Sequence, residues 1–223
     1  YHLVLLAESD KGYHNLSKIV TRGFTEGFYY KPRVDMEVLE KYHEGIIALS
    51  ACLAGEVAVN LRKGNYDEAR ETAIRYRNVF GADNYFLEMQ DHGIPEQSTV
   101  NAGVMRLSKE LGIPMVVTND SHYIYAEDWE AHDVLLCIQT NRKVQDENRM
   151  RYTGGQYYLK SKEEMAELFP YALEALENTH KIAERCNVNI VFGEQKVPRF
   201  DVPEGYTAEE YLEKLVYEGM EKK

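Results

Sequence analysis

The stretch MVVTNDSHYI at residues 115–124 joins a short apolar run to a D-x-H triplet. Its run of three apolar residues is typical of a strand that is buried on both faces of a sheet. Asp120 and His122 follow at the point where this strand would end. In parallel β/α architectures, functional side chains gather at the carboxyl ends of strands. The stretch is therefore either a metal-ligand loop or a plain strand end, in which the aspartate serves a turn.

Three further apolar runs have strand length, and none alternates cleanly between polar and apolar residues. They are HLVLLA (2–7), GIIALS (45–50) and NYFLEM (84–89). The segments between the runs have helical patterns that end at a glycine, which is the usual helix stop. These segments cover residues 15–27, 66–81 and 96–112. Alternating strands and helices predict an α/β fold of repeated β-α units, with a parallel sheet or a barrel.

The alternation ends after residue 123. Helices are expected at 127–138, after Ser161, at 172–186 and near the C-terminal end, with a short extended piece at 154–161. The residues SKEE from Ser161 are a capping-box signal for the helix that follows them. We therefore expect a domain boundary near residue 150, with a β/α domain over 1–150 and a mainly helical connector over 151–223.

Composition narrows the class of protein. The 223 residues carry a formal net charge of -11, which argues against a generally basic nucleic-acid surface. A carboxylate site holding divalent cations could still approach a phosphate. No apolar run approaches the ~18 residues that cross a bilayer. The three cysteines are far apart and odd in number, so we expect no disulfide framework and a cytoplasmic location.

Metal-ligating side chains recur where the predicted strands end. They are Cys52, Glu88, Asp91, His92, Asp120 and His122. A barrel would bring such strand ends together, and these side chains suit zinc, manganese or iron. The alternative is that Cys52 is a small buried hydrophobic residue, which is the commonest role of a free cysteine. His2 begins its run, so a simple reading of the strand places it at the opposite rim.

Seven motifs resemble, in this order, the PHP (polymerase and histidinol phosphatase) domain of bacterial DNA polymerase III alpha subunits. They are HLVLLAESDKGYHNL, GFYYKPRVD, GIIALSACLAGEV, NYFLEMQDHGIPEQ, TNDSHYI, HDVLLCIQT and YYLKSKEEM. The resemblance covers nearly the whole chain. It implies a distorted (β/α)7 barrel that binds up to three metal ions. In some related polymerases this site is a zinc- or manganese-dependent 3′→5′ exonuclease, and in others the domain is only structural.

The resemblance also implies roles for individual residues. The metal ligands would be His2, Cys52, Asp120 and His122, and the last two would also be catalytic. Glu88, Asp91 and His92 match family positions too, and we expect them to support the ligands rather than to bind metal themselves. From the residues themselves, we expect Lys31 and Arg33 in YYKPRVD either to contact a phosphate or simply to be solvated.

The first ligand motif of the family, an H-x-H followed by an aspartate, is absent from this sequence. So are the next histidine and glutamate. The chain begins with Tyr1 rather than Met, so we expect a fragment of a longer protein whose remaining ligands lie upstream. The polymerase palm and its catalytic aspartates are also absent, so this fragment is not expected to polymerise DNA.

The implied function is that of a DNA-directed DNA polymerase in DNA replication, with a phosphoesterase site in its PHP domain. One alternative is a non-catalytic scaffold that docks a separate proofreading exonuclease. A free-standing PHP phosphatase is a third candidate, which the connector after residue 150 disfavours. The expected cofactors are zinc or manganese in this site and magnesium in the parent polymerase. The expected partners are DNA, a sliding clamp and a proofreading exonuclease subunit. No association with a membrane is expected.

Overall fold

The computed structural model describes residues 1–194 and 197–222. These residues form two compact units, Tyr1–Asn189 and Ile190–Lys223. The first unit contains a four-stranded sheet and most of the helices, and the second contains a single described helix. The expected domain boundary near residue 150 stays a prediction, because compactness alone does not assign domains.

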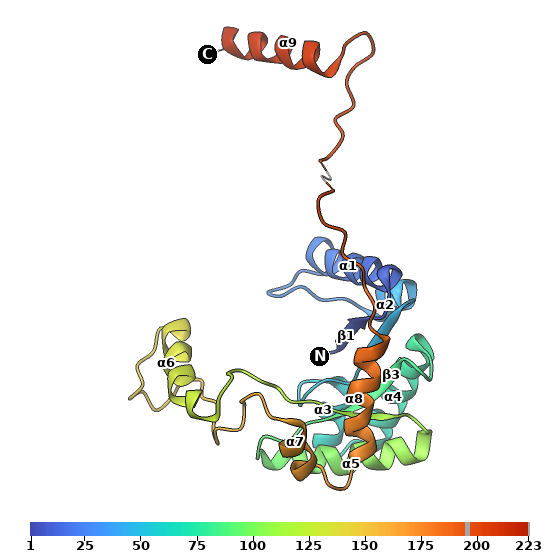
Figure 1. Cartoon of the computed structure of the whole chain (residues 1–223), viewed down its shortest axis with the longest axis vertical. Helices are drawn as coiled ribbons and strands as arrows, with labels where there is room; N and C mark the ends of the chain where they lie inside the picture. Colours follow the sequence, from blue (N-terminus) through green and yellow to red (C-terminus); the bar gives the residue numbers. More distant parts are fainter. Residues whose placement is uncertain (195–196, 223) are drawn as a thin grey trace. The chain divides into compact units, whose positions relative to one another are not determined.

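The elements before residue 118 alternate between strands and helices (Figure 1). They are β1 (Val4–Ala7), α1 (Asp10–Thr25), α2 (Met36–Tyr42), β2 (Ile46–Leu49), α3 (Glu56–Arg62), α4 (Tyr66–Phe80), β3 (Tyr85–Met89), α5 (Pro95–Leu111) and β4 (Met115–Val117). The later elements are the 3-10 turn η1 (Ala126–Asp128), α6 (Trp129–Thr140), α7 (Lys162–Leu168), α8 (Leu173–Arg185) and α9 (Ala208–Glu221). All four predicted strands are confirmed, and the predicted helices are found within a few residues of their expected bounds, except that α1 begins five residues early.

Two helices, α2 and α3, were not predicted. Each has seven residues, so neither shows two full repeats of an apolar stripe. The signal that precedes α2 is a helix cap rather than a periodicity. Asp35 accepts a hydrogen bond from the backbone N–H of Val38 at 3.1 Å.

The strands lie in the order β1-β2-β3-β4. The pairs β2–β3 and β3–β4 are parallel, as predicted. The pair β1–β2 is antiparallel, with Val4 opposite Leu49 and Ala7 opposite Ile46, so the prediction of a parallel sheet is wrong for this pair. A continuous apolar run does not encode direction, since both neighbours bury it equally. As a result, the start of β1 lies at the same edge as the carboxyl ends of the other strands.

Glycine lets α1 approach the loop before β2. A Cβ atom on Gly12 would lie 1.8 Å from the carbonyl oxygen of Gly45. The same turn of helix is capped by Ser9, whose Oγ accepts a hydrogen bond from the Gly12 N–H at 3.3 Å. Only glycine fits this contact, and the contact seats α1 against β1 and β2.

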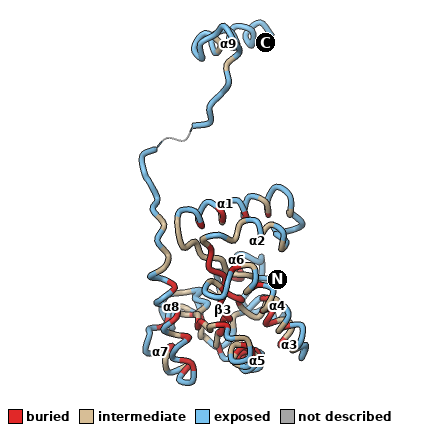
Figure 2. The backbone as a smooth tube through the Cα atoms, turned by 90° about the vertical axis from the view of Figure 1, so that its right-hand side faces the viewer, coloured by how far each residue is buried: buried red, intermediate tan, exposed pale blue. Residues whose placement is uncertain are grey.

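Successive residues of each strand enter two separate clusters, as the two-residue period of a strand requires. On one face, Ile46, Ala48, Tyr85 and Leu87 pack against residues of α3, α4 and α5. On the other face, a smaller cluster joins Ile47, Leu49, Phe86 and Val116 to Ile182 of α8. Figure 2 shows the buried stretches of the first unit gathered around the strands, whereas α9 in the second unit is exposed along most of its length.

The outer edge of β4 is covered by α8. Asn178 Nδ2 donates to the carbonyl oxygen of Met115 at 2.8 Å. Thr179 Oγ1 donates to the carbonyl oxygen of Val117 at 2.8 Å. Two side chains therefore satisfy backbone acceptors that a fifth strand would otherwise satisfy.

The mixed α/β class is confirmed, and the predicted capping box at Ser161 is present. Ser161 Oγ accepts from the Glu164 N–H at 3.2 Å, and the Glu164 carboxylate accepts from the Ser161 N–H at 2.7 Å. The seven-stranded barrel stays a prediction. The three cysteines are free, as expected. Within the described part of the chain, no helix combines the length and the apolar character that crossing a membrane requires.

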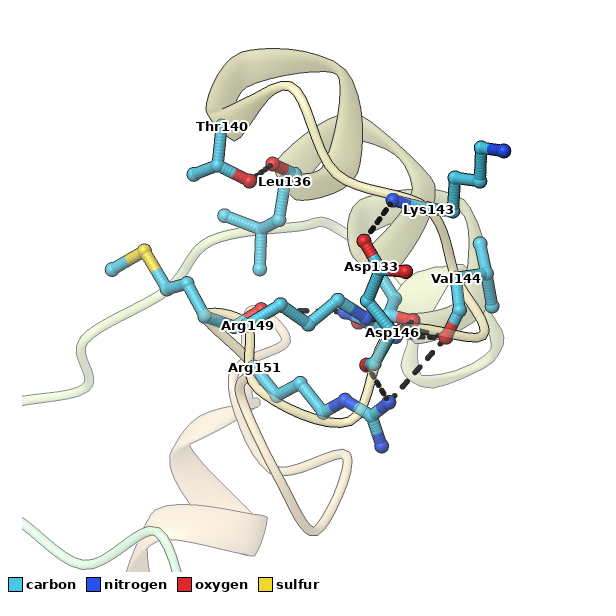
Figure 3. A network of polar contacts seen from close by, with 9 residues as sticks. Asp133, Leu136, Thr140, Lys143, Val144, Asp146, Arg149 and Arg151 are labelled. Atoms are coloured by element: carbon cyan, nitrogen blue, oxygen red, sulfur yellow. Dashed lines mark hydrogen bonds and ion pairs between the residues drawn. The ribbon is translucent and has the colours of Figure 1, made fainter.

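The segment after α6 folds back onto that helix through a buried guanidinium (Figure 3). Arg149 has a side chain that is only 2% exposed, and its two terminal nitrogens each donate to one carboxylate oxygen of Asp133 at 2.6 Å. The same side chain donates to the carbonyl oxygen of Val144 at 3.2 Å and 3.3 Å. This two-point pair fixes the turn that follows α6, because a fork of donors matches a carboxylate in only one orientation.

We expect the Asp133→Asn variant to loosen this turn and to remove its response to acid. The hydrogen bonds from Arg149 hold the pKa of Asp133 below its ordinary value. The pair therefore stabilises the fold fully above the unfolded-state pKa near ~3.9, and this stabilisation is lost as the pH falls through the lower folded-state value. Trp129, the only tryptophan and the first residue of α6, reports the change through its fluorescence.

The matched control is Glu130→Gln, which removes an exposed carboxylate from the same helix. This control should keep the acid transition of the unaltered chain, and Asp133→Asn should lack it. An identical titration of Trp129 fluorescence in both variants would contradict a role for the pair in holding the turn.

Candidate metal centre

His2 lies beside Cys52 because β1 runs antiparallel to β2. The His2 N–H donates to the carbonyl oxygen of Ala54 at 3.0 Å, and His2 forms an isolated bridge with Gly55. In this arrangement the His2 Nδ1 atom is 3.6 Å from the Cys52 Sγ atom. The strand argument from sequence placed His2 at the opposite rim, and the error came from the assumed direction of β1.

A tight turn after β2 presents Cys52. Ala51 is buried and adopts a left-handed conformation with φ of 65°, which is strained for a residue with a Cβ atom. Gly55 closes the turn, since its N–H donates to the Cys52 carbonyl at 2.8 Å and a Cβ atom there would lie 2.1 Å from the Ser50 carbonyl oxygen. The position of Cys52 is thus fixed by backbone geometry rather than by packing of its own side chain.

Asp120 and His122 lie in the segment that follows β4. The Asp120 Oδ1 atom is 3.4 Å from the His122 Nε2 atom, and both side chains are partly exposed. The His122 N–H donates to the carbonyl oxygen of Tyr157 at 2.7 Å, and Tyr123 forms a parallel bridge with Tyr158. Pairing with the segment around residues 157–158 therefore holds the D-x-H triplet, which sequence reasoning did not foresee.

Both pairs have the spacing of two ligands on one tetrahedral metal ion. Zinc bonds of ~2.3 Å to sulfur and ~2.0–2.1 Å to nitrogen place the two donor atoms about 3.6 Å apart. The His2–Cys52 pair has this separation. Oxygen and nitrogen ligands at ~2.0–2.1 Å lie about 3.3 Å apart, close to the 3.4 Å between Asp120 and His122. The donor atoms therefore fit a metal, although the first pair also suits a weak S–H···N hydrogen bond.

The two pairs do not merge into one larger cluster. Among the residues that the structure describes, no three histidine, cysteine, aspartate or glutamate side chains are grouped so that they could hold a metal ion. Each pair supplies about half of a four-coordinate site. The single site built from all four predicted ligands stays a prediction.

Glu88 links the two loops that carry these pairs. It is buried, and its Oε2 atom accepts a hydrogen bond from the backbone N–H of Ala51 at 2.9 Å. Its Oε1 atom accepts from Thr118 Oγ1 and from Gln90 Nε2. Burial raises the pKa of Glu88, and the hydrogen bonds from Thr118, Ala51 and Gln90 oppose this rise. One carboxyl group thus binds both Ala51, which precedes Cys52, and Thr118, which lies two positions before Asp120.

His92 is fixed by Gln97. The backbone N–H of His92 donates to Gln97 Oε1 at 2.7 Å, and Gln97 Nε2 lies 3.0 Å from His92 Nδ1. Because the amide oxygen is occupied, the amide nitrogen donates to Nδ1, and this assigns the Nε2–H tautomer to the neutral ring. The Nε2 atom is buried and has no hydrogen-bond partner in the described part of the chain. Burial lowers the pKa of His92.

With Nδ1 accepting from Gln97, the Nε2–H group of His92 is left to donate a hydrogen bond. Its ring is stacked on that of Tyr157 at 4.5 Å with an interplanar angle of 4°. The neighbouring Asp91 has a local role, because its Oδ1 atom accepts from the Gly93 N–H at 2.9 Å in the turn before α5.

An aromatic group surrounds His122. Its ring centroid is 4.4 Å from that of Tyr152, 5.6 Å from that of His132 and 5.7 Å from that of Tyr157. Burial lowers the pKa of His132, and the neighbouring His122 adds to this effect. Sequence reasoning missed these three neighbours, because their only signal is the aromatic content of the segments after residue 130.

The two predicted phosphate-contact residues, Lys31 and Arg33, lie in the exposed loop between α1 and α2. Neither forms an ion pair with any residue that the structure describes.

Residues 1–92 match the PHP domain family. This match includes His2 and Cys52 and ends before Asp120.

Over nearly its whole length, the chain is similar to alpha subunits of bacterial DNA polymerase III. It is 46% identical to the subunit of Treponema pallidum over 99% of the chain and 19% of that relative. It is 44% identical to the subunit of Deinococcus radiodurans over 100% of the chain and 17% of that relative. It is 39% identical to the subunit of Thermus aquaticus over 99% of the chain and 18% of that relative. The chain thus spans about a fifth of the length of these relatives.

Proposed function

We propose that this chain is the PHP region of a replicative DNA polymerase III alpha subunit and that it carries part of a metal-dependent phosphodiesterase site of the 3′→5′ exonuclease type. One observation carries the proposal. The antiparallel β1 brings His2 Nδ1 to 3.6 Å from Cys52 Sγ, the spacing of two ligands on one tetrahedral ion. The similarity to polymerase subunits supports DNA as the substrate.

The residues of the chain have separate tasks in this proposal. His2 and Cys52 would hold one metal ion, and Asp120 and His122 would hold another. The thiolate favours zinc, with manganese as the second candidate, whereas magnesium would serve the polymerase site. The bound ions would lower the pKa of water to near ~7 and stabilise charge that develops on the phosphate. Glu88 holds the two ligand loops in place relative to each other. The buried Nε2–H of His92 offers a hydrogen bond to an acceptor in the site.

A second candidate function is a scaffold that stabilises the polymerase and docks a separate proofreading exonuclease. The observation that favours it is the separation of the two donor pairs, which form no group of three in the described part of the chain. In either case the proposed setting is the bacterial cytoplasm, with DNA and a sliding clamp as further partners. The free-standing phosphatase is disfavoured, because the relatives are long polymerase subunits.

Metal content decides between the two candidates. We expect the full-length subunit to hold two or three ions, measured by elemental analysis, and the Asp120→Ala, His122→Ala double variant to lose at least one of them. The matched control is Asp67→Ala, His180→Ala, which removes the same residue types from exposed positions. A folded subunit without metal, or equal content in both double variants, would support the scaffold.

A further inference from the structure

The loop between α1 and α2 presents aromatic side chains to solvent. We define the aromatic loop as residues 27–34, with the sequence GFYYKPRV. Phe28 is 58% exposed, Tyr29 is 64% exposed and Tyr30 is 82% exposed. Large apolar rings gathered on one exposed loop commonly mark a binding surface. The loop projects from the ends of α1 and α2 (Figure 1).

The aromatic loop has a defined structure. The Arg33 N–H donates to the Gly27 carbonyl at 3.2 Å, which closes the loop at its base. A Cβ atom on Gly27 would lie 1.9 Å from the Arg33 carbonyl oxygen, so this base requires glycine. Near the tip, the Tyr29 N–H donates to the Lys31 carbonyl at 3.1 Å. The aromatic rings are thus held on a closed turn rather than on an open chain.

Tyr30 is strained at the tip of this turn. Its φ is 59°, a left-handed conformation that a bulky residue rarely adopts. Its ring contacts only that of Tyr29, at 4.6 Å and 75°, among the described aromatic residues. Core packing therefore does not explain why this position holds a tyrosine, since a glycine would adopt the same left-handed backbone without strain. Strained residues of this kind are concentrated at binding sites.

The charge of the aromatic loop is opposite to that of the whole chain. Residues 27–34 contain Lys31 and Arg33 and no acidic residue, although the chain has a net charge of -11. The Arg33 guanidinium lies 5.3 Å from the Tyr29 ring centroid, and neither cation forms an ion pair with a described residue. The two flanking acidic residues have other partners, since Glu26 pairs with Arg22 and Asp35 caps α2. Both cations are therefore available to an anion.

We propose that the aromatic loop binds single-stranded nucleic acid, with bases stacked on Tyr29 and Tyr30 and phosphates held by Lys31 and Arg33. Exposed rings beside unpaired cations are the combination that single strands require, since every base has a face that stacks. A duplex keeps its base faces inside the stack, and an acidic peptide would use the cations but not the rings. The assignment of the strand as DNA rests on the proposed function, but the binding itself needs no metal.

The test uses a fluorescein-labelled dT20 oligonucleotide and the 223-residue chain, with anisotropy measured at low salt in the presence of EDTA. We expect the Tyr29→Ala, Tyr30→Ala double variant to raise the Kd about 10-fold or more, the effect of losing a stacked base. The double control Tyr171→Ala, Tyr217→Ala removes two exposed tyrosines elsewhere and should leave the Kd unchanged.

Two further variants separate binding from folding. Tyr30→Gly suits the left-handed backbone, so it should keep or raise the Tm while it weakens dT20 binding, a split that a purely structural role would not give. Lys31→Gln, Arg33→Gln should reduce the slope of log Kd against log salt by ~1.4, because each phosphate contact on a single strand contributes ~0.7.

The proposal is overturned if the unaltered chain does not bind dT20, or if the tyrosine variants bind it equally well. It is also overturned if these variants keep dT20 binding and instead lose binding to a proofreading exonuclease subunit. Failure of the metal site would leave dT20 binding in EDTA intact, so the two proposals fail separately.

Discussion

Under the proposed function, the Asp120→Ala variant of the full-length subunit should lose 3′→5′ exonuclease activity and keep polymerase activity. Asp120 is the carboxylate of a donor pair whose atoms are 3.4 Å apart, a spacing that fits two ligands of one ion. Removal of the carboxylate leaves His122 as the only proposed ligand in residues 118–124. We expect a loss of at least ~100-fold in exonuclease rate, since even residues that only support a metal ligand affect activity by ~10–100-fold.

The measurement pairs two assays on one preparation. Release of a labelled 3′ nucleotide reports the exonuclease, and extension of a primer reports the polymerase. Asp67→Ala, an exposed aspartate on α4, is the matched control and should change neither activity. Equal loss of both activities would count against a separate site, because it would mean that the variant damages the subunit as a whole.

Glu88→Ala should have the largest effect on stability. The change leaves the buried N–H of Ala51 without its acceptor and removes the partner of Thr118 Oγ1. An unsatisfied buried donor and the cavity left by the side chain together cost roughly 3–5 kcal/mol in the free energy of unfolding. The metal affinity of the subunit should fall as well, since the loops of Cys52 and Asp120 would lose their common tie.

Glu88→Gln separates the hydrogen bonds from the shape of the side chain. The amide keeps the volume and one acceptor oxygen, so we expect it to be less destabilising than alanine in urea denaturation. Its NH2 group would face a donor, so the variant should still be less stable than the unaltered chain. Equal midpoints and slopes for the alanine and glutamine variants would show that Glu88 only fills space.

The sequence was informative about elements that bury long apolar patterns. The run NYFLEM and the stripe over residues 66–81 produced β3 and α4 within one residue of the expected bounds. It was less informative where structure depends on partners far along the chain. The direction of β1 and the pairing of Tyr123 with Tyr158 depend on which segments meet, and no local pattern encodes this.

The candidate site shows the same contrast between local patterns and partners far along the chain. Cys52 and Asp120 could be located from strand ends, because parallel strands bring those ends to one edge. His2 could not, since its place depends on the antiparallel β1. The left-handed Ala51, which positions Cys52, also gives no signal, because alanine is not a residue that marks such turns. A single metal site that joins all four ligands stays a prediction.

The two edges of the sheet differ in whether another strand can pair with them. At β4, Asn178 and Thr179 of α8 occupy the backbone acceptors of Met115 and Val117, so this side is closed to another strand. At β1, residues Val4–Ala7 pair with β2 and, within the described part of the chain, with no second strand. Any strand that is added to this sheet, from the same polypeptide or from another molecule, should therefore dock at β1. Such a strand would lie next to His2, so extension of the sheet and completion of the metal site would occur on the same side of the molecule.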